Sequence, residues 1–569
     1  MLLIDERVAL PTGPGFDTKT INKIPWLYFR KGQSKRVNGK LKHDSVAIGK
    51  IVEEQDGFKT LIPNDYYYEF VAKTSPPNKG KVARRGRKPR SKTANTYAEA
   101  KQGTVFAFGY GLACHKLAKD FKIKPILDNV FGPKIANAII AAASYLAKAH
   151  GGLSGMEYFT SKHMLFTDSV LSSQRLSDLY REITSELRDS FFAQWIETRS
   201  PVSCACYDVT SISSYSAKIP LICYGYNRDN EKLAQVNVGL FCSMDDRLPI
   251  FLDEYNGSIN DFTNLPYVLN HLMDLGFKGD ITLVTDGGFA TKETLDFIRE
   301  NSFNYIIGAP LGFYPGIKDQ VINWRSSPLA DGKSFDYDGD LITYKETTIE
   351  SAGHSCRLIM YQSSASSYRE RSTLSQVLSR AERKFSDINS LSVKQARRLV
   401  KEYDDLFFVR TCEDGSFVWT RNEVAINYAT KLCGCFAIFC TRHDLSPQKI
   451  LEHYRAKDMC EKFFDVYKND IIEERTHVSS PESLRGKLFI GFIALILRIG
   501  FRQKLGEMKK KKRSNTLDTV LMMLEDIKCR KSENAWVLNS ALSADQKEIL
   551  NLLDLDLHYL DTNNSLKPS

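Results

Sequence analysis

The chain has 569 residues, of which 43% are hydrophobic and 26% are charged. Both shares are close to the averages of soluble globular proteins, so disorder, collagen and coiled coil are excluded as descriptions of the whole chain. Lys and Arg number 78 against 68 for Asp and Glu, which gives a formal net charge of +10. A chain of this length is expected to divide into several domains.

Residues 1–72 mix short apolar runs with aromatic clusters, which predicts a small N-terminal domain that contains strands. Residues 73–96, the basic segment, have almost no large apolar side chains but contain nine Lys and Arg residues between Lys73 and Lys92, and no acidic residue. We expect an unpacked segment that carries +9 of the net charge and binds a polyanion. Because no amphipathic or lipidated anchor accompanies it, nucleic acid is favoured over a membrane surface.

The middle of the basic segment resembles an AT-hook, an extended Arg-Gly-Arg stretch that lies in the narrow minor groove of A·T-rich DNA. A solvated linker that binds any phosphate backbone is the alternative. Under either reading, the DNA contacts come from Arg84, Arg85, Arg87, Lys88 and Arg90.

The rest of the chain divides by pattern into five parts. Residues 97–200 have helical periodicity and are expected to recognise DNA, whereas residues 201–310 read as three strands, a helix, a strand, a helix and a strand. That order is typical of an RNase H-like core, a mixed sheet with helices in the α/β class. Residues 311–445 predict a β-rich insertion domain with hairpin turns at Asp338-Gly339 and Asp414-Gly415, residues 446–514 return to the core, and residues 515–569 predict a C-terminal helical tail that supplies dimer contacts.

Several classes of site and location are excluded. The apolar run Leu488–Leu497 is about half the length of a membrane span and predicts a buried helix. Met1–Pro11 lacks the order of a signal peptide, so we expect a cytoplasmic, nucleoid-associated protein. No Walker loop implies ATP, and the twelve scattered cysteines predict reduced, buried thiols rather than a zinc site.

Asp208 and Asp286 each stand at the end of a predicted core strand. Two carboxylates held close together repel each other unless a cation lies between them, and Mg²⁺ and Mn²⁺ prefer carboxylate oxygens. The alternative is that both are ordinary loop aspartates that accept backbone N–H bonds.

Tyr454, Lys457, Glu461 and Lys468 follow one another at spacings of three, four and seven residues in a predicted helix that opens at Ser446-Pro447. These spacings predict a single stripe on the helix. The stripe is either functional or an ordinary solvated face.

Taken together, these motifs resemble the DDE transposases of bacterial insertion sequences, in the group with a Tyr-x2-Arg-x3-Glu-x6-Lys (YREK) signature. Tyr454, Glu461 and Lys468 match the signature, while Lys457 stands where it has arginine and so keeps the charge but loses the bidentate fork. The resemblance covers about 200–500 and implies that Asp208, Asp286 and Glu461 are catalytic residues holding two Mg²⁺ or Mn²⁺ ions. It also implies that Tyr454, Lys457, Lys468 and, beside the stripe, Arg455 bind DNA.

The implied function is that of a transposase that binds the terminal inverted repeats of its element and catalyses metal-dependent DNA cleavage and strand transfer. Its partners would be double-stranded DNA of the transposon ends and target, and a second copy in a DNA-bound homodimer. Two alternatives remain: a transposase-derived DNA-binding protein without catalysis, and a metal-dependent nuclease that cuts without joining.

Overall fold

The structure, a computed structural model, describes residues 7–13, 16–21, 24–30, 35–37, 40–42, 45–53, 59–64, 67–73, 100–148, 153–167, 170–312, 316–326, 333–351, 354–472, 475–506, 516–532 and 536–555. The chain forms two compact units, Met1–Thr93 and Ala94–Ser569. Apart from Lys73, the basic segment with its AT-hook-like residues lies outside the described residues.

The first unit is built on a five-stranded antiparallel sheet. Its strand order is β1 (Val8–Ala9), β7 (Lys59–Pro63), β6 (Ser45–Glu53), β3 (Ile24–Arg30) and β2 (Phe16–Ile21). A small hairpin of β4 (Lys35–Val37) and β5 (Lys40–Lys42) and a π-helical turn η1 (Tyr68–Ala72) complete the unit. Leu27, Ile48, Ile51 and Leu61 form its buried core.

The second unit is organised around a nine-stranded mixed sheet. In spatial order the strands are β11 (Leu248–Asn256), β10 (Gln235–Ser243), β9 (Cys204–Ser213), β12 (Thr282–Thr285), β13 (Asn304–Ala309), β19 (Cys435–Cys440), β16 (His354–Ser363), β15 (Asp340–Ser351) and β14 (Lys333–Tyr337). Only the β9–β12 and β12–β13 pairs are parallel.

The first five of these strands follow the predicted alternation along the chain. β9, β10 and β11 form an antiparallel meander, and α8 (Asp261–Asp274) then connects to β12. After the short helix η4 (Gly287–Phe289), α9 (Lys292–Glu300) connects β12 to β13, as parallel neighbours require a crossover. The protein is therefore of mixed α/β class, with a large mixed sheet consistent with an RNase H-like core.

The segment 311–445 differs from the β-rich insertion domain that we predicted. β14, β15, β16 and β19 do not form a separate sheet but extend the core sheet beyond β13. They do so because β13 would otherwise be an open edge, and antiparallel pairing with β19 satisfies its backbone groups. Both predicted hairpin turns are confirmed, with Asp338 and Gly339 at φ of 52° and 77° between β14 and β15.

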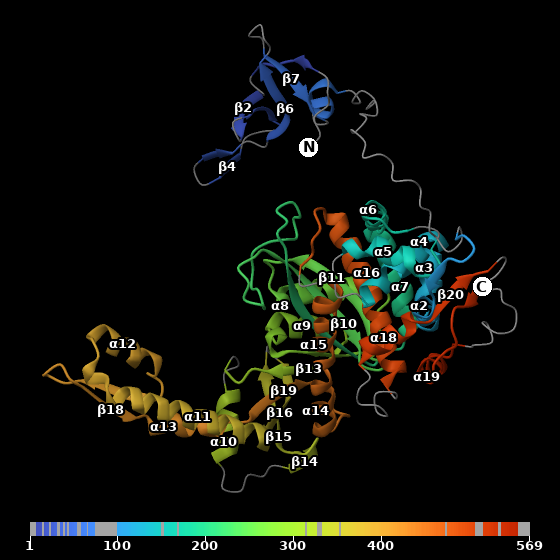
Figure 1. Ribbon diagram of the computed structural model, residues 1–569. Helices are drawn as coiled ribbons and strands as arrows, with labels where there is room; N and C mark the ends of the chain where they lie inside the picture. The colour runs from blue at the N-terminus through green and yellow to red at the C-terminus, as the bar shows by residue number, and fades with distance from the viewer. Residues whose placement is uncertain are drawn as a thin grey trace. The chain divides into compact units, whose positions relative to one another are not determined.

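The rest of this segment is largely helical and projects from the sheet (Figure 1). The projection, residues 364–434, consists of α11 (Ser364–Ser386), η5 (Ile388–Ser390), α12 (Val393–Glu402), the hairpin β17 (Phe407–Thr411) and β18 (Phe417–Arg421), and α13 (Glu423–Leu432). It has a small core of its own, in which Phe385 packs against Phe407 and Trp419. Outside it, α10 (Ile317–Ser326) lies against α13.

The described part of residues 97–200 is largely helical, as predicted, but its helices are part of the main core. α16 (Pro481–Lys504) is almost entirely buried and packs against α4 (Pro133–Lys148) and β11. The other helices of the region are α2 (Gly109–Asp120), α3 (Ile123–Phe131), η3 (Leu153–Gly155), α5 (Met156–Lys162), α6 (Ser173–Glu182) and α7 (Ser185–Arg199). α16 contains the run Leu488–Leu497, so its prediction as a buried helix is confirmed. In the described part of the chain, no helix combines the length and the hydrophobicity needed to cross a bilayer.

The C-terminal region is not the purely helical tail that we predicted. It contains α18 (Leu517–Glu525), the strands β20 (Lys528–Lys531) and β21 (Trp536–Leu538), and α19 (Ala544–Leu552). β20 pairs with β8 (Val105–Ala107), and Phe106 packs edge-on against Trp536. β20 also pairs with the adjacent β21, but its other partner, β8, lies more than 400 residues away, so no local signal in the sequence indicated this sheet.

A buried ion pair ties α7 to β11. Arg188 Nη2 donates to Glu254 Oε2 at 2.7 Å, and the two side chains are 9% and 10% exposed. We predict that Arg188→Ala destabilises the protein by about 3 kcal/mol, since it leaves a buried carboxylate with only the more distant Arg485. The urea midpoint of tryptophan fluorescence measures this change.

The matched control is Arg181→Ala, which removes an exposed ion pair with Asp178. Its cost should be about 1 kcal/mol or less. Equal midpoints for the two variants would contradict the importance assigned to the buried pair.

Candidate active site

The parallel pairing of β9 with β12 brings the two predicted aspartates to the same level of the sheet. Val284 pairs with Cys206, and extending this register by two residues sets Asp286 level with Asp208. Asp286 directly follows β12, as predicted. β9, however, does not end at Asp208 but continues to Ser213, because β10 still pairs with it where β12 has stopped.

Asp208 is largely buried beside this strand end. Its Oδ1 accepts the backbone N–H of Val209 at 2.8 Å. Burial, with the nearby charge of Asp286, raises the pKa of Asp208 to about 6, against the smaller opposing effects of the Val209 bond and of Lys457 and Arg228. The Asp208 carboxyl therefore changes between its protonated and ionised forms near pH 6.

Glu461 reaches the same place from the C-terminal part of the chain. The predicted cap is confirmed: Ser446 accepts the N–H of Lys449 at 3.2 Å and Pro447 is the first residue of α14 (Pro447–Ala456). The chain then passes through Lys457 into α15 (Asp458–Asp465), which carries Glu461 and packs against β9.

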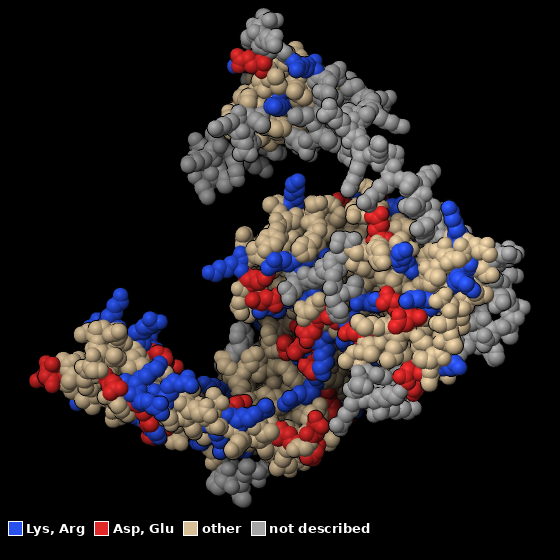
Figure 2. Space-filling model, viewed as in Figure 1, with Lys and Arg blue, Asp and Glu red and all other residues tan. Residues whose placement is uncertain are grey.

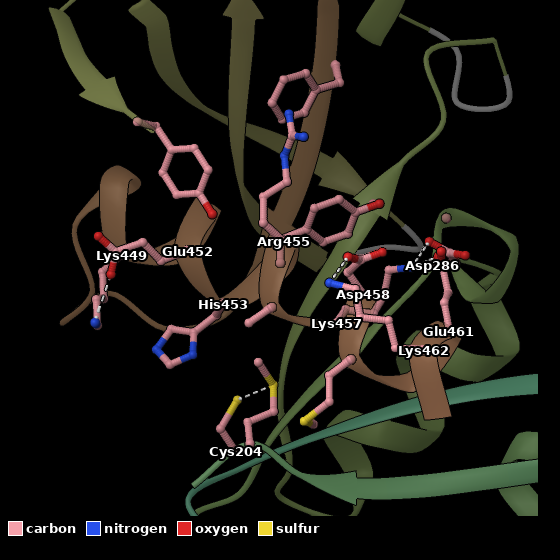
Figure 3. Close-up of a pocket in the computed structure, with 18 of the residues that line it drawn as sticks. Cys204, Asp286, Lys449, Glu452, His453, Arg455, Lys457, Asp458, Glu461 and Lys462 are labelled. Carbon is pink, nitrogen blue, oxygen red and sulfur yellow. Dashed lines mark hydrogen bonds and ion pairs between the residues drawn. The ribbon is translucent and has the colours of Figure 1, made fainter. Parts of the chain in front are cut away.

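Lys457 links two of the three acids (Figure 3). Its Nζ lies 2.8 Å from Asp286 Oδ1 and 3.4 Å from Glu461 Oε1, and its side chain is only 8% exposed. Burial opposes its charged form, but the hydrogen bond to Asp286 and the charges of Asp286, Asp208 and Glu461 raise the pKa of Lys457 overall. A buried ammonium therefore neutralises part of the acidic cluster.

The donor set fits a hard divalent cation, since all three predicted ligands are carboxylates. The carboxylate oxygens of Asp208, Asp286 and Glu461 are not all within 4.8 Å of one another; among the described residues only a cysteine cluster meets that spacing. The ammonium of Lys457 already contacts two of these acids, so it supplies positive charge between Asp286 and Glu461.

The acids Asp286 and Glu461 line a cleft of about 1270 Å³. Its walls come from α14, α15, the end of β13 and the start of β19 (Figure 3). Five further cationic side chains line it: Arg247, Lys449, Arg455, Lys462 and Arg502. Asp245, Asp338, Glu452 and Asp458 line it as well, so the cleft carries both signs of charge, with the cations available to a polyanion beside Asp286 and Glu461.

The single stripe predicted for the helix after Ser446 is wrong for its last member. Lys457 separates α14 from α15, and the chain becomes π-helical in η6 (Val466–Ile472), so the spacing of 3.6 residues per turn is not maintained. Lys468 instead forms an ion pair with Asp229 at 2.6 Å. Arg455 is exposed and lies over the ring of Phe436, 5.4 Å from its centroid.

A glycine in β13 leaves room for the Tyr454 side chain beside the end of that strand. A Cβ atom at Gly308 of β13 would lie 2.5 Å from the Tyr454 hydroxyl, so only glycine leaves room for the phenol. Burial, with the nearby charge of Asp286, raises the pKa of Tyr454, which keeps its hydroxyl as a proton donor.

Two features near the acids did not emerge from the sequence. Arg228 and Asp229 lie in the loop between β9 and β10, where Arg228 forms an ion pair with Asp261 and Asp229 forms one with Lys468. Nothing in the sequence spacing indicated that this loop lies near the site. Cys206, Cys242 and Cys460 cluster behind the acids. The pairing of β9 with β10 could have suggested two of these cysteines, but not the third on α15.

Comparison with known proteins gives one family. The family described as "Transposase DDE domain" matches residues 200–497, which is more than half of the chain. No curated protein sequence matches the chain. Among solved structures, a cryo-EM structure of the piggyBac transposase synaptic complex with hairpin DNA is 11% identical, with a TM-score of 0.35 over 81% of this chain and 86% of that chain.

The environment of Asp208 leads to a pH-dependent prediction. Because its pKa is raised from 3.8 to about 6 in the folded protein, ionisation of Asp208 costs stability as the pH rises through this range. In chelator, Asp208→Asn should therefore be about 3 kcal/mol more stable than the parent at pH 8, with the difference disappearing towards pH 4. Urea midpoints at the two pH values measure this.

Asp280→Asn is the control, because Asp280 is exposed and forms an ion pair with Arg442 at 2.7 Å. Asp280→Asn should be no more stable than the parent at pH 8. A loss of stability in Asp208→Asn at pH 8 would contradict the predicted cost of its charge.

Proposed function

The chain belongs to the transposase DDE domain family, and on that premise we propose that it binds the terminal inverted repeats of an insertion sequence and catalyses cut-and-paste transposition. The observation that carries this proposal is that the buried ammonium of Lys457 contacts Asp286 and Glu461 and is also stabilised by the nearby charge of Asp208. These acids come from three segments of the matched region.

Asp208, Asp286 and Glu461 would hold the two Mg²⁺ or Mn²⁺ ions of the proposed reaction. When bound, such ions activate an attacking water or 3′-hydroxyl and stabilise the leaving oxygen in phosphodiester chemistry. The raised pKa of Asp208 supports this role, because a carboxyl that is costly to ionise gains most from a cation.

The neighbouring side chains would position DNA. Lys457 already contacts Asp286 and Glu461, so we assign it first to organising the acids and second to a phosphate. Tyr454 and the exposed Arg455 remain proposed DNA contacts, and Arg455 lines the cleft. Lys468 would reach a phosphate only by giving up Asp229.

The projection offers a second basic surface. Figure 2 shows Lys and Arg side chains along it. The exposed cations of α11 and α12 are Arg369, Arg371, Arg380, Arg383, Lys384, Lys394, Arg397, Arg398 and Lys401. We propose that this surface, together with the basic segment, holds the DNA backbone, and that the DNA-bound form is a homodimer.

The decisive experiment compares the parent with Glu461→Gln on a labelled duplex that carries the element's own end and its flank. With Mg²⁺ or Mn²⁺, the parent should cut and join, whereas the variant should bind equally well and lose cleavage by about 100-fold or more. Gel separation of nicked, broken and joined products measures each step.

Glu452→Gln is the matched control. Glu452 lines the same cleft on α14 and forms an exposed pair with Lys449 at 2.8 Å, so its loss should leave cleavage unchanged. If the parent cuts DNA without joining it, the result favours a metal-dependent nuclease. If the parent binds DNA without cutting it, the result favours a DNA-binding protein without catalysis. Unchanged cleavage in Glu461→Gln would remove it from the catalytic set.

The basic segment generates a separate prediction. Replacing Arg84, Arg85, Arg87, Lys88 and Arg90 with Ser should reduce the slope of log affinity against log salt by about 4, because each phosphate contact contributes about 0.9. An AT-hook predicts a larger loss on A·T-rich than on G·C-rich duplexes, whereas a non-specific linker predicts equal losses.

Replacement of Lys509, Lys510, Lys511, Lys512 and Arg513 with Ser is the control of equal charge. An equal change of slope in both variants would show that net charge alone, and not the position of the basic segment, determines affinity.

A further inference from the structure

Three cysteines from distant parts of the chain meet directly behind the acidic cluster. Cys206 of β9 is paired with Cys242 of β10, and Cys460 comes from α15. All three side chains are fully buried, and their Sγ atoms lie within 4.8 Å of one another. The closest pair, Cys206 and Cys460, has its Sγ atoms 2.9 Å apart.

We propose that Cys206, Cys242 and Cys460 form a binding site for one thiophilic d¹⁰ metal ion, Zn²⁺ or Cu⁺, separate from the carboxylate site. Three sulfurs at about 2.3 Å from one ion lie about 3.8–4.0 Å apart, which is compatible with the observed cluster after the closest pair separates by about 1 Å. Cysteine sulfurs are soft ligands that select Zn²⁺ and Cu⁺ over Mg²⁺ and Mn²⁺.

The thiols have only weak alternative partners. Cys206 Sγ donates to the Cys242 carbonyl and Cys460 Sγ to the Cys206 carbonyl, both at 3.8 Å. Metal binding would replace these contacts with metal–sulfur bonds, and each coordinated thiol would release its proton to solvent. No oxidant or reductant takes part.

The position of the site gives it a structural consequence. Cys460 immediately precedes Glu461, and Cys206 is two residues before Asp208. A metal ion held by both cysteines would fix α15 to β9 and thereby set the separation of two of the three proposed catalytic acids. The cysteines would then act as positioning residues and would not touch substrate.

The test begins with the metal content of the full-length protein, purified without chelator, by elemental analysis. Metal-free protein is then titrated anaerobically with Zn²⁺, Cu⁺ or, as a spectroscopic probe, Co²⁺. We expect about one ion per chain and, with Co²⁺, thiolate-to-metal absorption bands. Saturating Mg²⁺ should not displace the ion, because it does not compete for thiolates.

Cys242→Ser removes the ligand farthest in sequence from the acids and should weaken binding by about 10-fold or more. Cys440→Ser is the matched control: Cys440 is buried in β19 of the same sheet, outside the cluster, and should leave binding unchanged. Circular dichroism checks that both variants fold. If Cys242→Ser does not fold, the Co²⁺ spectrum of the parent still decides the question.

Three results would overturn the proposal. The first is metal-free protein that binds neither Zn²⁺ nor Cu⁺ and gives no thiolate bands with Co²⁺. The second is equal binding in Cys242→Ser and the parent. The third is a Cys206–Cys460 disulfide, found by mass spectrometry of the protein purified under reducing conditions. None depends on DNA cleavage, so failure here would leave the proposed transposition untouched.

Discussion

The arrangement of the proposed active centre depends on the parallel pairing of β9 with β12. Side chains alternate along a strand, so a shift of this pairing by one residue would turn one aspartate away from the other. The buried apolar residues of both strands fix the register, and β10 holds β9 in place beyond the end of β12. The chemistry of the cleft therefore rests on the packing of a hydrophobic sheet.

The third acid is positioned by contacts of a different kind. α15 contacts the sheet through the cysteine cluster and through the ammonium of Lys457. Further along the chain, α16 lies buried against α2, α4 and α6. The helices that precede and follow the sheet strands in the sequence therefore pack together: residues near 140, 190 and 490 share one core with the sheet. Such a core explains why a helical region that resembles a separate module in the sequence is an integral part of the fold.

Much of the fold was predictable because its signals are local. The order of strands and helices in residues 201–310 was predicted, Asp286 was predicted at a strand end, and the Ser446 cap was recognised from two residues. Features that depend on distant partners were missed: the extension of the sheet by β19 and the pairing of β20 with β8. The sequence could indicate that Lys457 lies near Glu461, but not that its ammonium is buried against Asp286.

The projection leaves the sheet and returns to it at almost one point. Gln362, near the end of β16, pairs with Cys435, the first residue of β19, and Ser363 donates its N–H to the Gly434 carbonyl at 2.9 Å. Because the two ends meet as the ends of a hairpin turn do, a few residues could close the same gap. The projection is therefore an insertion between two paired strands, and shortening it would leave the strands next to Asp208 and Asp286 uninterrupted.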